Sequence, residues 1–133
     1  MALSTTAKNT VLTSLVGSSK AAGAPGTLYL ALYDGNPTTT GAELGTSGGY
    51  ARLAVTSNDT NFGEATAGEK ANLTTFTFPT STAAYSAPAT YVVIFDASSE
   101  GNAYWYGALS ATVTVDAAGY NVIFSVGDFT LVM

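Results

Sequence analysis

Histidine and cysteine are both missing from this sequence. Histidine is the commonest side chain for proton transfer near neutral pH and for metal binding, and a cysteine thiolate is the nucleophile or metal ligand of many other sites. Without them the chain cannot build a Ser-His-Asp or Cys-His nucleophile, a thiolate metal site or a disulfide. These absences exclude most hydrolase mechanisms and leave the redox compartment open.

Charge is also scarce. Charged residues make up 10% of the chain, against roughly 25% in typical soluble domains. Four basic and nine acidic residues give a formal net charge of -5, and the basic residues Lys8, Lys20, Arg52 and Lys70 are scattered. Phosphate binding needs clustered positive charge, so no nucleic acid partner is expected. So weakly charged a surface does little to keep copies apart, and we expect much of it to be buried against partners.

The chain has no long hydrophobic run. No stretch approaches the roughly 18 consecutive apolar residues of a transmembrane helix, so no membrane insertion is expected. Residues 1–20 contain Lys8 and a mildly apolar section that resembles a signal peptide at first sight. Thr, Asn and Ser interrupt that section, which argues against a signal peptide.

The most strand-like segment is TLYLALY, residues 27–33, which runs into the turn residues Asp34, Gly35, Asn36 and Pro37. Leu28, Leu30 and Leu32 alternate with Tyr29, Ala31 and Tyr33, so both faces are apolar enough to be covered. The segment is short for a helix, and its Thr and Tyr content favours a strand. We therefore predict a central strand that carries a long loop over residues 38–49.

A short amphipathic helix is predicted over residues 4–16. Ala7, Val11, Leu12, Leu15 and Val16 are spaced about four residues apart, which lines one side of a helix. Ser4 or Thr5 can cap its start, and Gly17 can end it. Its Thr and Asn content gives it weak intrinsic propensity, so it should hold only by packing.

Further short strands are predicted after residue 50, separated by polar turns. Their ranges are 50–56, 72–78, 91–95, 103–109, 112–115, 120–126 and 129–133, with loops at 57–70 and 80–89. About eight strands at such spacing are typical of an antiparallel β-sandwich or jelly roll. We therefore predict one all-β domain over residues 1–133, with the N-terminal helix as its only helix.

The alternation within these strands also predicts the hydrophobic core. We expect it to contain Leu30, Leu32, Leu53, Val55, Phe76, Phe78, Val93, Phe95, Trp105, Val113, Val115, Val122 and Phe124. Phe62, in the polar segment 57–70, is expected to turn inward.

No catalytic, cofactor or metal site is expected. Almost all of the nine acidic residues fall in predicted turns, where Asp and Glu are ordinary, so paired carboxylates for glycoside hydrolysis are not indicated. Asp34-Gly35-Asn36 and Asn58-Asp59-Thr60-Asn61 resemble fragments of calcium loops, but the full EF-hand spacing is absent. We favour structural turns at both places and predict that the protein is not an enzyme.

Aromatic residues offer the other candidate site. Tyr91, Tyr104, Trp105 and Tyr106 could stack on a sugar, but on an alternating strand Trp105 faces away from Tyr104 and Tyr106. That arrangement favours one core residue flanked by two surface or interface residues. For Arg52, the only arginine, we favour a surface position on a strand, and a subunit contact is the second interpretation. The candidate contact residues for self-association or lattice binding are Val11, Leu15, Arg52, Tyr104 and Tyr106.

Several blocks resemble a known family. The sequence contains LYLALYDGNP, GGYAR and IFDASSEGNAYWYGAL, preceded by AKNTVLTSLVG and followed by VDAAGYNVIFSVGDFTL. In this order the blocks resemble small tailed-bacteriophage proteins of the gp80-like type, described as tail fibre or minor tail proteins. The resemblance covers nearly the whole chain. It implies a structural component of the virion, assembled in the host cytoplasm.

Proteins of this size and type are also similar to the cement or decoration proteins that bind the outside of phage capsids. We favour capsid decoration, because 133 residues without a coiled coil or β-helix do not provide a fibre shaft. The expected partners are the major capsid protein or other virion proteins, together with further copies of the chain. The alternative is a tail fibre or minor tail protein that binds carbohydrate on the host surface.

Overall fold

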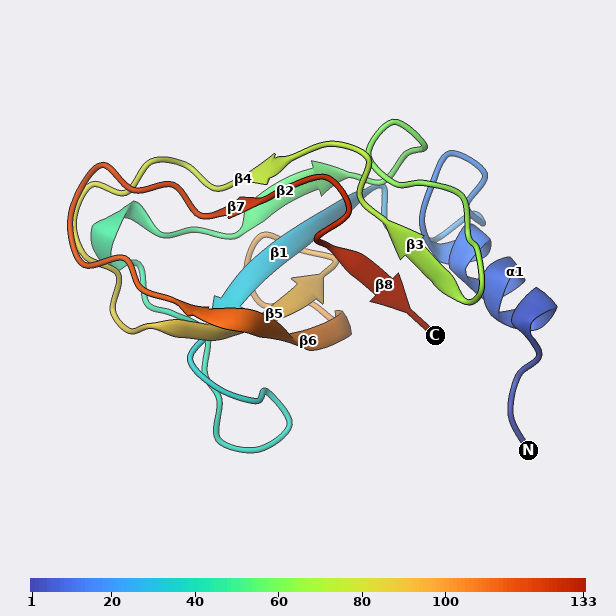
Figure 1. Ribbon diagram of the computed structural model, residues 1–133, viewed down its shortest axis with the longest axis horizontal. Helices are drawn as coiled ribbons and strands as arrows, with labels where there is room; N and C mark the ends of the chain where they lie inside the picture. The colour runs from blue at the N-terminus through green and yellow to red at the C-terminus, as the bar shows by residue number, and fades with distance from the viewer. The chain divides into compact units, whose positions relative to one another are not determined.

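The computed structural model describes all 133 residues, and its regular structure is mostly β-strand, joined by long loops and turns (Figure 1). Helix α1 spans Thr5–Leu15, and a single 3-10 turn, η1, spans Ser47–Gly49. The strands are β1 Thr27–Tyr33, β2 Leu53–Thr56, β3 Glu69–Ala71, β4 Phe76–Thr77, β5 Ala89–Phe95, β6 Ala103–Val113, β7 Ile123–Phe124 and β8 Thr130–Val132. Eight strands with one N-terminal helix confirm the predicted all-β class.

The strands form one four-stranded sheet, in the order β2-β1-β5-β6, and two strand pairs, β3-β8 and β4-β7. The pairs β1-β5, β5-β6 and β3-β8 are antiparallel, as the predicted sandwich requires. This strand order is consistent with a β-sandwich and does not confirm jelly-roll connectivity.

The chain packs as two compact units. The helical unit consists of Met1–Thr27, Val55–Phe76 and Phe124–Met133, and the sheet unit consists of Leu28–Ala54 and Thr77–Ile123. Each unit is assembled from segments far apart in the sequence. The organisation of residues 1–133 as a single domain stays a prediction.

In the sheet unit, β1 is the central strand that its sequence predicts. Leu28, Leu30 and Leu32 are at most 1% exposed, and Ala31 on the opposite face is fully buried. Both faces are therefore covered, as expected for the middle of a sheet. Tyr50 adds an aromatic cluster to this core, because its ring stacks on Phe78 and meets Tyr85 edge to face.

In the helical unit, α1 begins after Ser4, which caps it, and ends at Leu15, two residues before the predicted glycine. The Ser4 hydroxyl accepts a hydrogen bond from the Ala7 amide at 3.2 Å, and Gly17 has a φ of 119°. Leu12 and Val16 are fully buried. The Lys70 ammonium donates to the Val16 carbonyl at 2.6 Å, which satisfies a carbonyl that the end of the helix leaves free.

A second aromatic cluster and one amide hold the rest of the helical unit. The ring of Phe76 meets those of Phe62 and Phe129 edge to face, so Phe62 turns inward as predicted. Asn72 is 1% exposed and uses its whole side chain. Its Nδ2 donates to the carbonyls of Thr74 and Ser125, and its Oδ1 accepts from the amides of Gly127 and Phe129.

Several strands of the structure are shorter than the segments predicted for them. The segment 72–78 forms a strand only at β4, 120–126 only at β7, and 50–56 only from Leu53 onward. Near these strands, side chains such as Asn72 and Tyr50 take over backbone hydrogen bonds. In contrast, the predicted break between 103–109 and 112–115 is wrong, because β6 continues through it to Val113.

The predicted core is also corrected at several positions. Leu53, Trp105, Val113 and Phe124 are half-buried, whereas the other nine predicted core residues are buried. Trp105 and Val113 lie on β6, which has a neighbouring strand on only one side, so less of their surface is covered. The segment 57–70, predicted as a polar loop, contains the start of β3 and the buried Lys70.

Candidate functional site

Four tyrosines lie on one face of the four-stranded sheet. Across the antiparallel pairs, Tyr33 lies opposite Tyr91, and Tyr106 lies opposite Val93, which in turn lies opposite Ala31. Opposed residues share a face, and residues two apart on a strand share it too. Tyr29, Tyr33, Tyr91 and Tyr106 are therefore on the same face, which we call the tyrosine face.

The tyrosine face has a rigid apolar base. Ala31, Val93 and Phe95 form a buried cluster, and Tyr29 and Tyr33 pack against it. The ring of Tyr33 stacks on that of Phe95 with centroids 6.4 Å apart. Burial, with a smaller contribution from the Glu43 carboxylate, raises the pKa of Tyr33 above its ordinary value, so its hydroxyl keeps its proton.

Exposure on this face increases toward β6. Tyr29, Tyr33 and Tyr91 are half-buried, whereas Tyr106 is 57% exposed. Tyr104, which lies at a register irregularity between β5 and β6, is 40% exposed. Tyr104 and Tyr106 therefore reach the surface as predicted, whereas Trp105, predicted as a core residue, is only half-buried.

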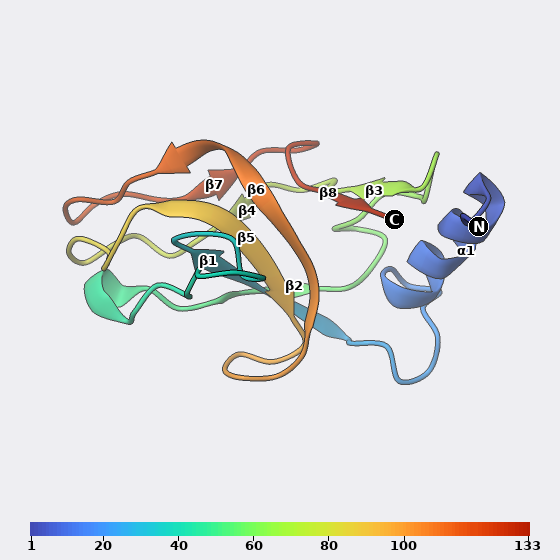
Figure 2. The ribbon, with the colours of Figure 1, turned by 90° about the horizontal axis from the view of Figure 1, so that it is seen from below.

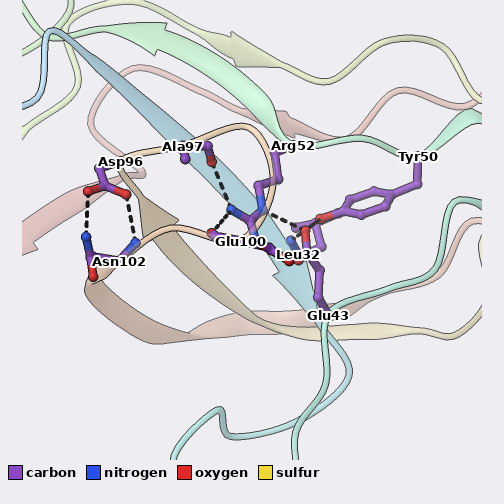
Figure 3. A network of polar contacts seen from close by, with 8 residues as sticks. All are labelled: Leu32, Glu43, Tyr50, Arg52, Asp96, Ala97, Glu100 and Asn102. Atoms are coloured by element: carbon purple, nitrogen blue, oxygen red, sulfur yellow. Dashed lines mark hydrogen bonds and ion pairs between the residues drawn. The ribbon is translucent and has the colours of Figure 1, made fainter.

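Arg52 lies against the same face and is held by an internal network (Figure 3). Its Nε and Nη2 donate to the two carboxylate oxygens of Glu43, both at 2.9 Å. Its Nη1 donates to the carbonyls of Ala97 and Glu100, both at 2.8 Å, and its Cζ lies 3.7 Å from the ring centroid of Phe95. The Arg52 side chain is only 6% exposed, so its charge is neutralised inside the unit.

Tyr50 extends the network into the sheet. Its hydroxyl accepts the Leu32 amide at 2.9 Å and donates to Glu43 Oε1 at 3.0 Å, so it replaces a strand partner at that point of β1. Burial raises the pKa of Tyr50 well above its ordinary value, and the Glu43 hydrogen bond raises the pKa of Arg52. Neither group exchanges a proton near neutral pH, and the network acts as a clamp on the loops at 34–50 and 96–102.

Asp96 closes the second of these loops (Figure 3). Its Oδ1 accepts the Asn102 amide at 2.7 Å and its Oδ2 accepts Asn102 Nδ2 at 3.0 Å. The Asn102 side chain, and then its amide, lower the pKa of the Asp96 carboxyl. The carboxylate therefore fixes the turn that presents the Ala97 and Glu100 carbonyls to Arg52.

The helix candidates belong to the helical unit. Val11 and Leu15 are half-buried, and their neighbours Leu12 and Val16 are the fully buried residues of the stripe. Arg52, Tyr104 and Tyr106 belong to the sheet unit. The contact roles of all five residues stay predictions, and Arg52 has most of its hydrogen-bonding capacity used internally.

The two segments that resemble calcium loops form turns. Asn36 Oδ1 accepts the amide and hydroxyl of Thr38, and Asp34 Oδ1 accepts the Ala42 amide at 2.8 Å. In the second segment, Asn58 Oδ1 accepts the Asn61 amide at 2.9 Å. Asp59 Oδ1 accepts the Ser18 amide at 2.9 Å, from a segment 41 residues away. The side-chain oxygens named here thus bond backbone amides or a neighbouring hydroxyl of the chain itself.

Sequence reasoning missed Tyr29, Tyr33 and Glu43 as members of this face. The two tyrosines carry a signal in the alternation of TLYLALY, which places them on the same face of the strand as Ala31. Glu43 has no such signal. Its role depends on the chain turning back so that Arg52, nine residues later, meets its carboxylate, and no local pattern predicts that turn.

The described residues thus form an all-β protein with an aromatic face whose one arginine is paired internally with Glu43. The family model described as Podophage GP4 fiber I protein gp80 matches residues 2–132, and the chain belongs to this bacteriophage virion protein family. It is therefore a phage structural protein whose partners are other virion proteins. No curated protein matches the chain. No helix of the structure has the length and apolar character needed to cross a bilayer.

Proposed function

We propose that this phage structural protein is a capsid decoration, or cement, protein that binds the assembled head through its tyrosine face. The observation that carries the proposal is the composition of that face. Strands β1, β5 and β6 contain no charged residue, and four tyrosines project from them over a buried base. Protein interfaces are enriched in tyrosine and depleted of charge at their centres.

The rigidity of the face supports the same proposal. The Arg52 clamp and the Tyr33–Phe95 stack hold the side chains before any partner binds, so little conformational freedom is lost on docking. Binding across neighbouring subunits of the major capsid protein would stabilise the assembled shell by mass action, since loose subunits do not offer the composite site. No catalytic step and no cofactor are part of this proposal.

The basic residues support the proposal that nucleic acid is not the partner. Arg52 is paired with Glu43, and the ammonium groups of Lys70 and Lys20 donate to backbone carbonyls within the helical unit. Only Lys8 makes no such bond among the four basic residues. A phosphate backbone needs several free positive groups on one surface.

A second candidate is favoured by the family description, which names a fibre. In that role the chain is a tail fibre or minor tail protein, and the exposed rings of Tyr104 and Tyr106 stack on host-surface carbohydrate. The same tyrosines thus serve either function, and the location of the chain on the particle separates the two.

Locating the protein on intact phage by cryo-electron microscopy or immunogold labelling tests the proposal. Many copies spread over the head support decoration, and a few copies at the tail support the fibre candidate. If the protein is a cement, the heads of virions assembled without it should also break open at a lower temperature. A glycan array tests carbohydrate binding separately, with Tyr106→Ser as the variant expected to lose any signal.

A further inference from the structure

Strand β6 ends the four-stranded sheet, and its outer side is the feature that the proposed function leaves unused. In the order β2-β1-β5-β6 it pairs with β5 on one side and with no strand on the other. Figure 2 shows β6 running alongside β5. At 11 residues it is the longest strand in the chain. Alternate residues of such an edge direct backbone N–H and C=O groups away from the sheet, where another strand can pair with them.

The middle of the edge lacks the usual protection against pairing. Natural edge strands are blocked by lysine, proline, inward-pointing charge or β-bulges, and β6, with the sequence AYWYGALSATV, has no charged residue and no proline. Two register irregularities against β5 are present, one near Tyr104 and one between Ala108 and Val113. Between them, Trp105 to Ala108 pair regularly with Ile94 to Tyr91, so the middle of the strand is a straight template.

We infer that the β6 edge pairs with the β6 edge of a second copy of this chain, in antiparallel orientation, so that two four-stranded sheets become one continuous sheet. A strand is its own best match in length, and an antiparallel pair of identical strands closes about a two-fold axis. The inference goes beyond the proposed function, because it holds whether the chain acts on the head or on the tail.

Charge does not oppose a second copy at this place in the molecule. The weakly charged surface does little to keep copies apart, and the nine acidic residues all lie outside this edge. No charged residue occurs between Glu100 and Asp116, so the edge is a long neutral segment on which two copies can meet. Pairing also brings the exposed rings of Tyr104 and Tyr106 against the partner, which adds side-chain burial to the backbone hydrogen bonds.

The oligomeric state of the intact chain tests the inference directly. Analytical ultracentrifugation across the micromolar range is expected to show a monomer–dimer equilibrium for the wild type. Ala108→Lys places a charge in the regular part of the edge, at an exposed position, and is expected to shift the chain to monomer. Ala118→Lys adds the same charge at an exposed turn position and is expected to leave the dimer unchanged.

Two further measurements keep the test decisive. Far-ultraviolet circular dichroism shows whether Ala108→Lys is folded, and Tyr106→Ser, which removes the most exposed ring of the edge without adding charge, is expected to weaken the dimer roughly tenfold. Trp105 is the only tryptophan, so its fluorescence reports on the edge itself and should shift with dilution. A wild type that stays monomeric at the highest concentration overturns the inference, as does a dimer that folded Ala108→Lys leaves intact.

Discussion

The guanidinium of Arg52 lies over the ring of Phe95, with its Cζ 3.7 Å from the ring centroid, while its nitrogens bind both carboxylate oxygens of Glu43. Phe95 belongs to β5, Glu43 to the loop after β1, and Arg52 to the segment before β2. One side chain thus joins three separate parts of the sheet unit. The only arginine of the chain is a structural clamp beneath the tyrosine face, and its loss is expected to affect stability before binding.

Arg52→Lys is expected to lower the free energy of unfolding by about 2 kcal/mol, because an ammonium cannot form the two parallel bonds to Glu43 or stack on Phe95. Urea denaturation followed by Trp105 fluorescence measures the change. Glu100→Gln is the matched control, since only the backbone carbonyl of Glu100 contacts Arg52. Equal stability of Arg52→Lys and the wild type would show that the clamp is not needed.

Tyr50 is expected to make the protein sensitive to alkali. Its pKa is raised in the folded state by burial, so the folded chain keeps a proton that the unfolded chain releases near the ordinary tyrosine pKa of 10.0. The stabilising contribution is complete below pH 10.0 and is lost as the pH rises beyond it. Tyr33 and Tyr85, whose pKa values are also raised, add to the effect.

Tyr50→Phe separates the contribution of this hydroxyl. The variant is expected to be about 1–2 kcal/mol less stable at neutral pH, because the Leu32 amide loses its acceptor. It should also lose stability less steeply than the wild type above pH 10.0. Chemical denaturation at a series of alkaline pH values checks both effects, and parallel curves for the two proteins would contradict the assignment.

Asp96 is expected to act at the acid end. Its pKa is lowered in the folded state, so its contribution to stability is present above the ordinary value of 3.8 and is lost as the pH falls through the lower folded value. Asp96→Asn should therefore flatten the acid side of the stability profile. Thermal unfolding between neutral and acid pH measures the profile, and Asp116→Asn, an exposed acidic residue without a hydrogen bond to Asn102, is the control.

Asn72 is expected to be the most sensitive polar residue of the helical unit. Asn72→Ala removes four side-chain hydrogen bonds and leaves the buried Phe129 amide without its acceptor, at a cost of about 3 kcal/mol. Asn121 is exposed, and its side chain bonds the Phe78 carbonyl and the Thr80 hydroxyl where water can replace it, so Asn121→Ala should cost only about 1 kcal/mol. Urea unfolding measures the stability of both variants. Similar losses would show that the hydrogen bonds of Asn72 contribute no more than those of a surface amide.

The elements whose stability is decided locally are the ones that the sequence predicts. The Ser4 cap, the helix from Thr5 to Leu15 and the alternation of Thr27–Tyr33 all depend on neighbours within a few residues, and all are confirmed. The surface position of Tyr104 and Tyr106 follows from the same alternation. These features together establish the fold class and half of the candidate face.

The residues that sequence reasoning missed are those that act across long stretches of chain. Tyr50 is buried because its hydroxyl completes β1 at Leu32, 18 residues earlier, and Lys70 is buried because the Val16 carbonyl, 54 residues away, accepts its ammonium. Both residues look like ordinary polar or surface positions in their own segments. The fold brings their partners to them from distant segments, so no periodicity in the sequence predicts these contacts.

The make-up of the helical unit has a consequence for how the chain acquires its structure during translation. All of the sheet unit has been synthesised by Ile123, whereas the helical unit also needs Phe124–Met133. Within that segment β8 pairs with β3, the strand that presents Lys70 to the end of α1. The residues that contact α1 directly, Ser57 to Lys70, are synthesised well before residue 124, but β3 gains its pairing partner only when β8 follows. The helical unit is therefore completed only after every residue of the sheet unit has been synthesised.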